Sequence, residues 1–222
     1  MDEMHAPMIL IEHGQSDKID PDPNQRKHGV IMSKIQSVCV YCGADAGSNP
    51  AFKEAAENFG RMLAKNKIQM VFGGGWDGLM GITARAAVQA GAHVKGIMPH
   101  FLSHLAEATC NEIVFTKSMH ERKQRMFDDS DAFVALPGGI GTLEELAEQL
   151  KWIQLGQHSK PVFLLNIEDY WTPFLELLEH MKTYNFLKGN VDAILHVCTS
   201  VDEIERTIEH LNSAHLLPHS QI

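Results

Sequence analysis

The sequence predicts an α/β fold in which a doubly wound parallel sheet is flanked by helices. Short apolar runs of strand length alternate with longer stretches whose apolar residues recur at helical spacing. The short runs are almost continuously apolar, as expected of strands that helices cover on both faces. Strand-helix alternation of this kind favours right-handed crossovers and a parallel sheet.

The elements follow one another in a regular order. Strands are expected at residues 35–41, 68–72, 93–98, 132–136, 161–165 and 193–197. Helices are expected at residues 50–66, 78–91, 120–130, 142–156, 170–184 and 201–212. Ser48 or Asn49 can cap the first helix, and Pro50 can start it. Ligands of such sheets bind at the carboxyl ends of the strands, so the loop after each strand is a candidate site.

Residues 1–34 differ in composition from the rest of the chain. They are polar, are interrupted by Pro21 and Pro23, and show no periodicity. We expect a mobile N-terminal extension at 1–34 and a single domain at 35–222.

Charge and cysteine content exclude several classes of protein. Lys plus Arg number 19 against 28 Asp plus Glu, and the net charge of −9 disfavours nucleic acid and anionic membrane as partners. The four cysteines are too sparse for a disulfide framework, which favours a cytoplasmic protein. Cys39 and Cys42 are expected to be buried thiols, since no second pair completes a metal site. No apolar stretch approaches the roughly 20 residues of a membrane span.

Two glycine-bearing loops follow the first two predicted strands. In "YCGADAGSNP", Gly43 precedes a helix start and forms a plausible but weak anion-facing turn. In "FGGGWDGLMG", Gly73, Gly74 and Gly75 end a strand. A tight turn with positive φ is one explanation, but three adjacent glycines exceed that need and favour phosphate or ligand contact. The loop matches neither the dinucleotide fingerprint nor a P-loop.

A third glycine-rich loop joins a predicted strand to an acidic helix. Pro137 ends the strand in "ALPGGIGTLEELAEQL", and Thr142 can offer a hydroxyl at the helix start. Gly138, Gly139 and Gly141 expose backbone donors, so a phosphate could sit there without a lysine. The adjacent acids Glu144 and Glu145 point about 100° apart on a helix, so one of them can face a pocket. Complementing the helix dipole is the alternative role for either acid.

Positive charge gathers just upstream of this loop, in "SMHERKQRM". Arg122 and Arg125 share a helix face, whereas Lys123 points elsewhere. A solvated basic face is the ordinary explanation. The segment nevertheless leads directly into the strand that delivers the third glycine loop.

Together, "GGGWDGLMG", "MHERK" and "PGGIGTLEE" resemble the LOG family over residues 35 to about 211. Its members are cytokinin riboside 5′-monophosphate phosphoribohydrolases, often described as lysine-decarboxylase-like. The resemblance implies a Rossmann-like homodimer that hydrolyses the N-glycosidic bond of a nucleoside 5′-monophosphate, such as AMP or a cytokinin riboside monophosphate. The products would be the free base and ribose 5-phosphate. Release of a free cytokinin base from its riboside monophosphate would be cytokinin activation.

The resemblance also implies roles for individual residues. Arg122 and Glu145 would be catalytic, while Met119 and Lys123 would belong to the substrate site. The glycines and Thr142 would bind phosphate. The chain departs from the family at Ser118, where an Asp is usual, and at Ala44, where a serine is usual. The scheme needs no metal and no cofactor, and a lysine decarboxylase would need pyridoxal phosphate on a lysine that nothing here marks.

A non-catalytic nucleotide-binding sensor on the same fold is the alternative. It would use the glycine loops to bind its ligand without breaking a bond. The presence of Glu145 favours the enzyme, because phosphate binding alone needs no carboxylate near the anion.

Overall fold

The structure is a computed structural model that describes residues 34–187 and 191–214. The predicted extension at 1–34 therefore lies outside the described residues, apart from Lys34. The strands are β1 (Ser37–Tyr41), β2 (Gln69–Phe72), β3 (Val94–Pro99), β4 (Glu112–Thr116), β5 (Ala132–Ala135), β6 (Val162–Leu165) and β7 (Leu195–Cys198). The α-helices are α1 (Pro50–Lys65), α2 (Gly78–Gln89), α3 (Met119–Asp128), α4 (Ile140–Gln154), α5 (Thr172–Thr183) and α6 (Val201–Ala214). Short 3-10 helices are η1 (His100–Leu105), η2 (Ile167–Asp169) and η3 (Val191–Ala193).

Each predicted strand and helix is confirmed, with ends that differ by a few residues. Asn49 caps α1 through its side chain, which accepts a hydrogen bond from the N–H of Ala51, and Pro50 is the first helical residue. Strand β4 was not predicted. It is an edge strand whose side chains are mostly exposed or half-buried, and it begins with Glu112, so it lacks a continuous apolar run.

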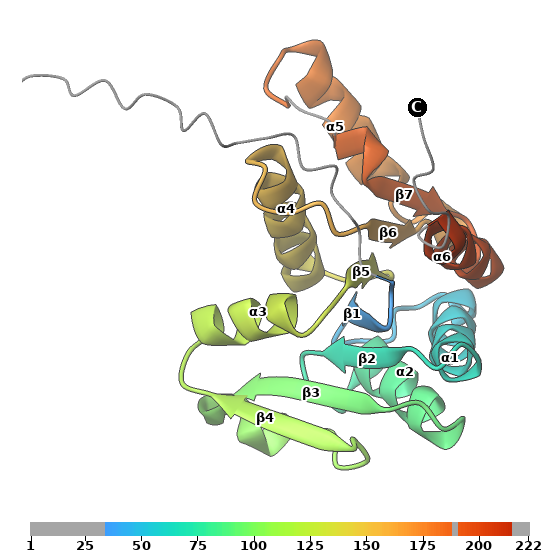
Figure 1. The fold of residues 1–222 in the computed structure, drawn as a ribbon. Coiled ribbons are helices and arrows are strands. Elements are labelled where there is room, and N and C mark those ends of the chain that lie inside the picture. The colour runs from blue at the N-terminus through green and yellow to red at the C-terminus, as the bar shows by residue number, and fades with distance from the viewer. Residues whose placement is uncertain (1–33, 188–190, 215–222) are drawn as a thin grey trace, which may run out of the picture. The chain divides into compact units, whose positions relative to one another are not determined.

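The strands form a seven-stranded sheet in the order β4-β3-β2-β1-β5-β6-β7. Every pairing is parallel, which confirms the predicted doubly wound sheet. The direction in which successive strands are added to the sheet reverses between β1 and β5. Strands β2, β3 and β4 lie on one side of this point, and β6 and β7 lie on the other (Figure 1). Ligand sites of such sheets form at this switch point.

Helices cover both faces of the sheet, as the apolar strands require (Figure 1). Val38 and Val40 of β1 point into the core beneath α1, α2 and α6. Cys39 and Tyr41 point into the opposite core beneath α3, α4 and α5. Because alternate residues of β1 enter different cores, the strand is fixed in register and the loop that follows it is held firmly at the switch point.

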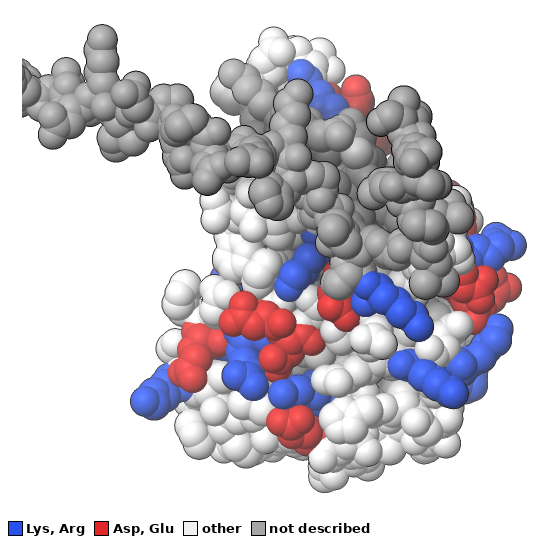
Figure 2. Space-filling model, in the orientation of Figure 1, with Lys and Arg blue, Asp and Glu red and all other residues white. Residues whose placement is uncertain are grey.

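Charged residues of both signs share the face shown in Figure 2, and the cysteines are mostly buried. Acidic and basic side chains lie interspersed on the face shown in Figure 2. Cys39, Cys42 and Cys198 are buried, and all four cysteines are free thiols. Within residues 34–187 and 191–214, no helix is long and apolar enough to cross a membrane.

Candidate active site

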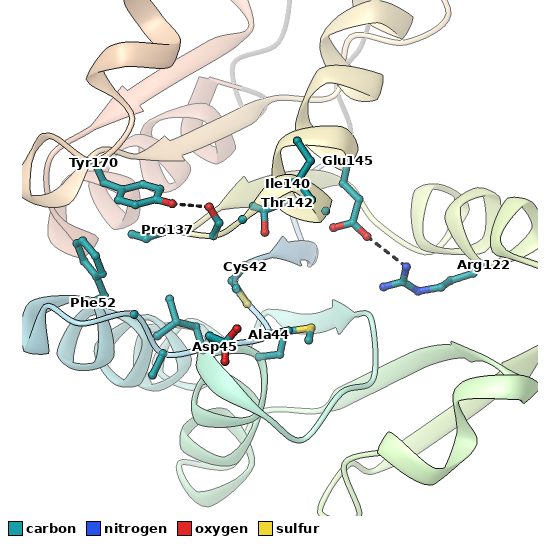
Figure 3. A pocket seen from close by; sticks show the side chains of 18 residues that line it. Cys42, Ala44, Asp45, Phe52, Arg122, Pro137, Ile140, Thr142, Glu145 and Tyr170 are labelled. Atoms are coloured by element: carbon teal, nitrogen blue, oxygen red, sulfur yellow. Dashed lines mark hydrogen bonds and ion pairs between the residues drawn. The ribbon is translucent and has the colours of Figure 1, made fainter.

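A cavity of about 490 Å³ opens at the switch point, above the carboxyl ends of β1 and β5 (Figure 3). The loop after β1, residues 42–47, forms one wall, and the loop after β5, residues 137–142, forms another. Phe52, Leu79, Met80, Arg122, Glu145 and Tyr170 complete the lining. The cavity therefore collects side chains and backbone from segments that are far apart in the sequence.

The glycine loop after β5 offers backbone to this cavity. A Cβ at Gly138 would lie 2.1 Å from Oγ1 of Thr142, so only glycine lets this buried threonine pack under the loop. A Cβ at Gly139 or Gly141 would meet nothing within 4 Å. Helix α4 begins at Ile140, and the N–H groups of a first helical turn have no acceptor within the helix. The loop can therefore hold an anion against backbone donors and the positive end of the helix dipole.

Gly43 joins the loops that form the two walls. Its N–H donates to the carbonyl of Pro137 at 3.0 Å, and its own carbonyl accepts from the N–H of Met80 at 3.3 Å. Gly43 lines the cavity as expected, but its N–H is already used to connect the loops. Gly43 therefore lines the cavity and also holds its two walls together.

Arg122 and Glu145 meet at one end of the cavity (Figure 3). Nη1 of Arg122 lies 3.4 Å from Oε1 of Glu145, and each side chain is only 13% exposed. Nε of Arg122 also donates to the carbonyl of Ile97 at 3.2 Å, which fixes the guanidinium against β3. The two residues that the sequence analysis named as catalytic therefore form a partly buried ion pair.

Burial raises the pKa of Glu145 to about 7. The Arg122 guanidinium opposes this shift, while the neighbouring Glu144 carboxylate adds to it. A carboxyl group with this pKa changes its protonation state near neutral pH, a property typical of groups that work in catalysis.

The start of α3 fixes where Arg122 emerges. The hydroxyl of Ser118 accepts from the N–H of Glu121 at 3.1 Å, and the Glu121 carboxylate accepts from the N–H of Lys117 at 2.8 Å. The arrangement is close to a capping box, with the Glu121 carboxylate on the N–H of the residue before the N-cap. Ser118 thus supplies the same kind of capping oxygen that an Asp would supply at this position.

The glycine loop after β2 lies behind the cavity and does not line it. A Cβ at Gly73 would lie 2.1 Å from Nη2 of Arg122, so this glycine makes room for the guanidinium. Gly74 has φ +80°, and its carbonyl accepts from the N–H of Glu107 at 2.8 Å. Gly75 forms a β-bridge with Ala106. The backbone of Gly73, Gly74 and Gly75 thus packs against the chain itself and supports the site, and a substrate contact for these glycines stays a prediction.

Met119 and Lys123 also lie outside the cavity lining. Met119 is 41% exposed at the first position of α3. Nζ of Lys123 contacts Glu144 at 2.7 Å and Glu148 at 3.0 Å. The Glu144 side chain is 56% exposed and Glu145 lines the cavity, so one acid of the adjacent pair faces the pocket, as predicted.

Sequence reasoning missed Asp45, Phe52 and Tyr170, which line the cavity. The hydroxyl of Tyr170 donates to the carbonyl of Gly138, and its ring meets Phe52 edge-on at 5.3 Å between centroids. Tyr170 was assigned to a helix, although its position soon after the strand beside β5 was a usable signal. In the described part of the chain, no group of three His, Cys, Asp or Glu side chains is placed to hold a metal ion.

Comparison with known proteins adds a family. Residues 80–208 match the profile of a family described as "Possible lysine decarboxylase". The chain is 40% identical over 181 residues to the cytokinin riboside 5′-monophosphate phosphoribohydrolase LOG1 of Arabidopsis thaliana, covering 81% of this chain and 85% of that protein. It is 39% identical over 180 residues to a probable enzyme of the same name, LOGL1, of Oryza sativa subsp. japonica, covering 80% and 81%. The Moco carrier protein of Chlamydomonas reinhardtii has the same fold, with a TM-score of 0.63, 20% identity and coverage of 81% and 99%.

Proposed function

The chain belongs to the LOG family of cytokinin riboside 5′-monophosphate phosphoribohydrolases, and from this premise we propose how its cavity performs that hydrolysis. The substrate is a nucleoside 5′-monophosphate, with AMP and cytokinin riboside monophosphates as candidates. The products are the free base and ribose 5-phosphate. The observation that carries the proposal is the Arg122–Glu145 pair beside an anion-binding helix start in one cavity.

The substrate is held by its phosphate at the start of α4. The N–H groups of residues 140–142 and the hydroxyl of Thr142 are the donors, and Gly139 and Gly141 leave the space open. Glu145 follows Thr142 by three residues, so it lies about one helical turn further along α4. A phosphate at the helix start therefore places the ribose within reach of the Glu145 carboxylate.

In the reaction, the bond between C1′ and the base nitrogen breaks. Its electron pair leaves with the base, the oxygen of a water molecule adds to C1′, and a proton from that water ends on the base. Positive charge builds on the sugar before the water adds, so a carboxylate stabilises the transition state more than the ground state. Glu145 supplies this charge, and it is also placed to take the proton of the attacking water.

Arg122 assists from its position beside Glu145. A guanidinium has five N–H donors, so Arg122 can hold Glu145 and the carbonyl of Ile97 and still donate to the departing base. The contact with Ile97 keeps the side chain in place before substrate arrives. Arg122 therefore acts both on the geometry of Glu145 and on the leaving group.

The test is to incubate the protein with AMP and with isopentenyladenosine monophosphate and to measure free base by chromatography. Glu145→Gln should lower kcat by about a thousandfold or more, and Arg122→Ala by about a hundredfold. Glu176→Gln and Arg206→Ala change exposed residues of α5 and α6 and serve as matched controls. Tight binding of AMP without release of base would instead support the sensor.

A lysine decarboxylase is not the function that we propose, despite the description of the family profile. Pyridoxal phosphate chemistry needs a lysine that can form a Schiff base in the site. The side chains that line the cavity include no lysine among the described residues, and Lys123 is paired with two glutamates outside the lining.

We also propose that the protein is a cytoplasmic homodimer. The free thiols support a reducing compartment, and the LOG resemblance supports the dimer. Light scattering coupled to size-exclusion chromatography measures the mass directly, and a monomeric mass at micromolar concentration would refute the dimer.

A further inference from the structure

Two neighbouring basic residues of α3 form ion pairs with α4. Arg122 and Glu145 form the pair that faces the cavity. One residue further along α3, Lys123 reaches Glu144 at 2.7 Å and Glu148 at 3.0 Å. We propose that Lys123 is a positioning residue that ties α3 to α4 and so holds Arg122 against Glu145. We call Lys123, Glu144 and Glu148 the lysine clamp; its catalytic consequence rests on the proposed function.

Helix geometry explains why neighbouring residues of α3 reach different carboxylates of α4. Adjacent helical residues point about 100° apart, so Arg122 and Lys123 leave α3 in different directions, as Glu144 and Glu145 leave α4. Glu148 lies four residues after Glu144 and shares its face. An ammonium group carries three donors and can therefore bridge both carboxylates.

Helix α3 needs such a tie more than α4 does. Met126 is the buried residue of α3, which is ten residues long and mostly polar. Helix α4 buries Leu146, Leu150 and Ile153 in the core. Phe127, near the end of α3, packs edge-on against Trp152 of α4 at 5.0 Å between ring centroids, but no side chain of residues 119–125 is buried. An ionic link to the well-packed α4 should therefore limit the movement of this first part of α3 and of Arg122.

The clamp replaces the predicted role of Lys123 as a substrate-binding residue. Its ammonium group has two carboxylate partners and lies outside the cavity lining. Exposed ion pairs contribute little to stability, but Lys123 and Glu148 are only 21% and 23% exposed. Their value here is geometric, because a displacement of about 1 Å at a catalytic group can lower turnover a hundredfold.

The clamp also affects the protonation of Glu145. The charge of Lys123 lowers the pKa of Glu145, whereas Glu144 and Glu148 raise it. Removing Lys123 takes away the lowering charge and leaves two carboxylates without their partner, so both changes raise that pKa. The charged and titratable groups around Glu145 are Arg122 and Lys123 from α3, Glu144 and Glu148 from α4, Cys39 and Tyr41 from β1, and Cys42 from the loop after β1.

The experiment compares Lys123→Met, which keeps the aliphatic stem, with Lys123→Arg, which keeps the charge. Lys151→Met, at an exposed position of α4, is the matched control. Lys123→Met should lower kcat for AMP about tenfold while KM changes less than about twofold. Its acid limb should move to higher pH, and Lys123→Arg should recover most of the loss. In a Glu144→Gln/Glu148→Gln background, Lys123→Met should have a smaller effect.

Two kinetic results would overturn the clamp: a large rise in KM at unchanged kcat, which would make Lys123 a substrate contact, or kinetics within about twofold of the parent. A second measurement is an NMR titration of the Glu145 carboxyl with 13C-labelled glutamate, whose midpoint should rise in Lys123→Met. This readout needs no turnover. If the parent protein released no base, the proposed function would fail, while an unmoved Glu145 midpoint would be the result that removes the clamp.

Discussion

Two glycine-rich loops look alike in the sequence but do different work in the structure. Residues 137–142 follow β5 and line the cavity, with open space over Gly139 and Gly141. Residues 73–75 follow β2 and lie behind it, where Gly73 admits the guanidinium of Arg122. A run of glycines therefore marks a close approach to the backbone, and sheet topology decides whether a ligand or the protein itself approaches.

The position of each strand explains the difference. Strand β5 lies beside β1 at the switch point, where the flanking crossovers diverge and leave the helix start of α4 open. Strand β2 lies on the far side of β1, beside β3. Its loop is covered by the segment around Glu107, whose N–H donates to Gly74. The backbone of the second loop is thus occupied before any ligand arrives.

The largest expected effect comes from a charge placed in the loop after β5, residues 137–142. Gly139→Asp adds a carboxylate beside the proposed phosphate site, and we expect kcat/KM for AMP to fall about a thousandfold, because like charges in contact repel by several kcal/mol. Gly139→Asn is the matched control, with the same shape and no charge, and should lose much less. Both residues are good N-caps, so the thermal midpoint of unfolding should hold or rise in each variant. Equal losses in the two variants would argue against an anion at this loop.

The next largest effect tests the second loop. Gly73→Ala places a Cβ where Nη2 of Arg122 lies 2.1 Å away, so the guanidinium must move from Glu145. We expect kcat to fall about a hundredfold with a small change in KM. In an Arg122→Lys background, the same alanine should cost far less, because lysine lacks the branched guanidinium. Gly73→Ala with parental kcat would remove Gly73 from the support of Arg122.

The sequence predicted the fold better than the roles of the loops. Strands such as β5 and β6 are continuously apolar and could be recognised one at a time, whereas the edge strand β4 is half-exposed and could not. The Arg122 and Glu145 pair followed from motifs that resemble a family. The contacts of Gly73 and Lys123 join α3 to segments distant in sequence, so no local pattern encodes them. Tyr170 carries a usable signal in its position soon after β6, but its hydrogen bond to Gly138 also joins segments distant in sequence.

A smaller effect concerns the protonation state of Glu145, which its burial and its charged neighbours control. Burial raises the pKa of Glu145 to about 7, and the proposed mechanism uses the carboxylate form. The acid limb of kcat/KM should therefore fall about tenfold for each pH unit below 7. The phosphate of AMP titrates near pH 6 and could produce a similar limb. Glu144→Gln separates the two, because loss of the Glu144 charge lowers the pKa of Glu145 and moves the midpoint to lower pH, while the substrate is unchanged.

The smallest effect is expected at Tyr170, beside the loop after β5. Tyr170→Phe removes the hydroxyl that donates to the carbonyl of Gly138 but keeps the ring against Phe52. One hydrogen bond contributes about 1 kcal/mol, so KM for AMP should rise about fivefold with kcat within about twofold of the parent. Tyr184→Phe, at a 62% exposed tyrosine, should change neither constant. A fall in kcat without a change in KM would contradict a role in phosphate binding alone. It would mean that the loop also orients the ribose over Glu145, so that the position of the phosphate controls the rate of bond cleavage.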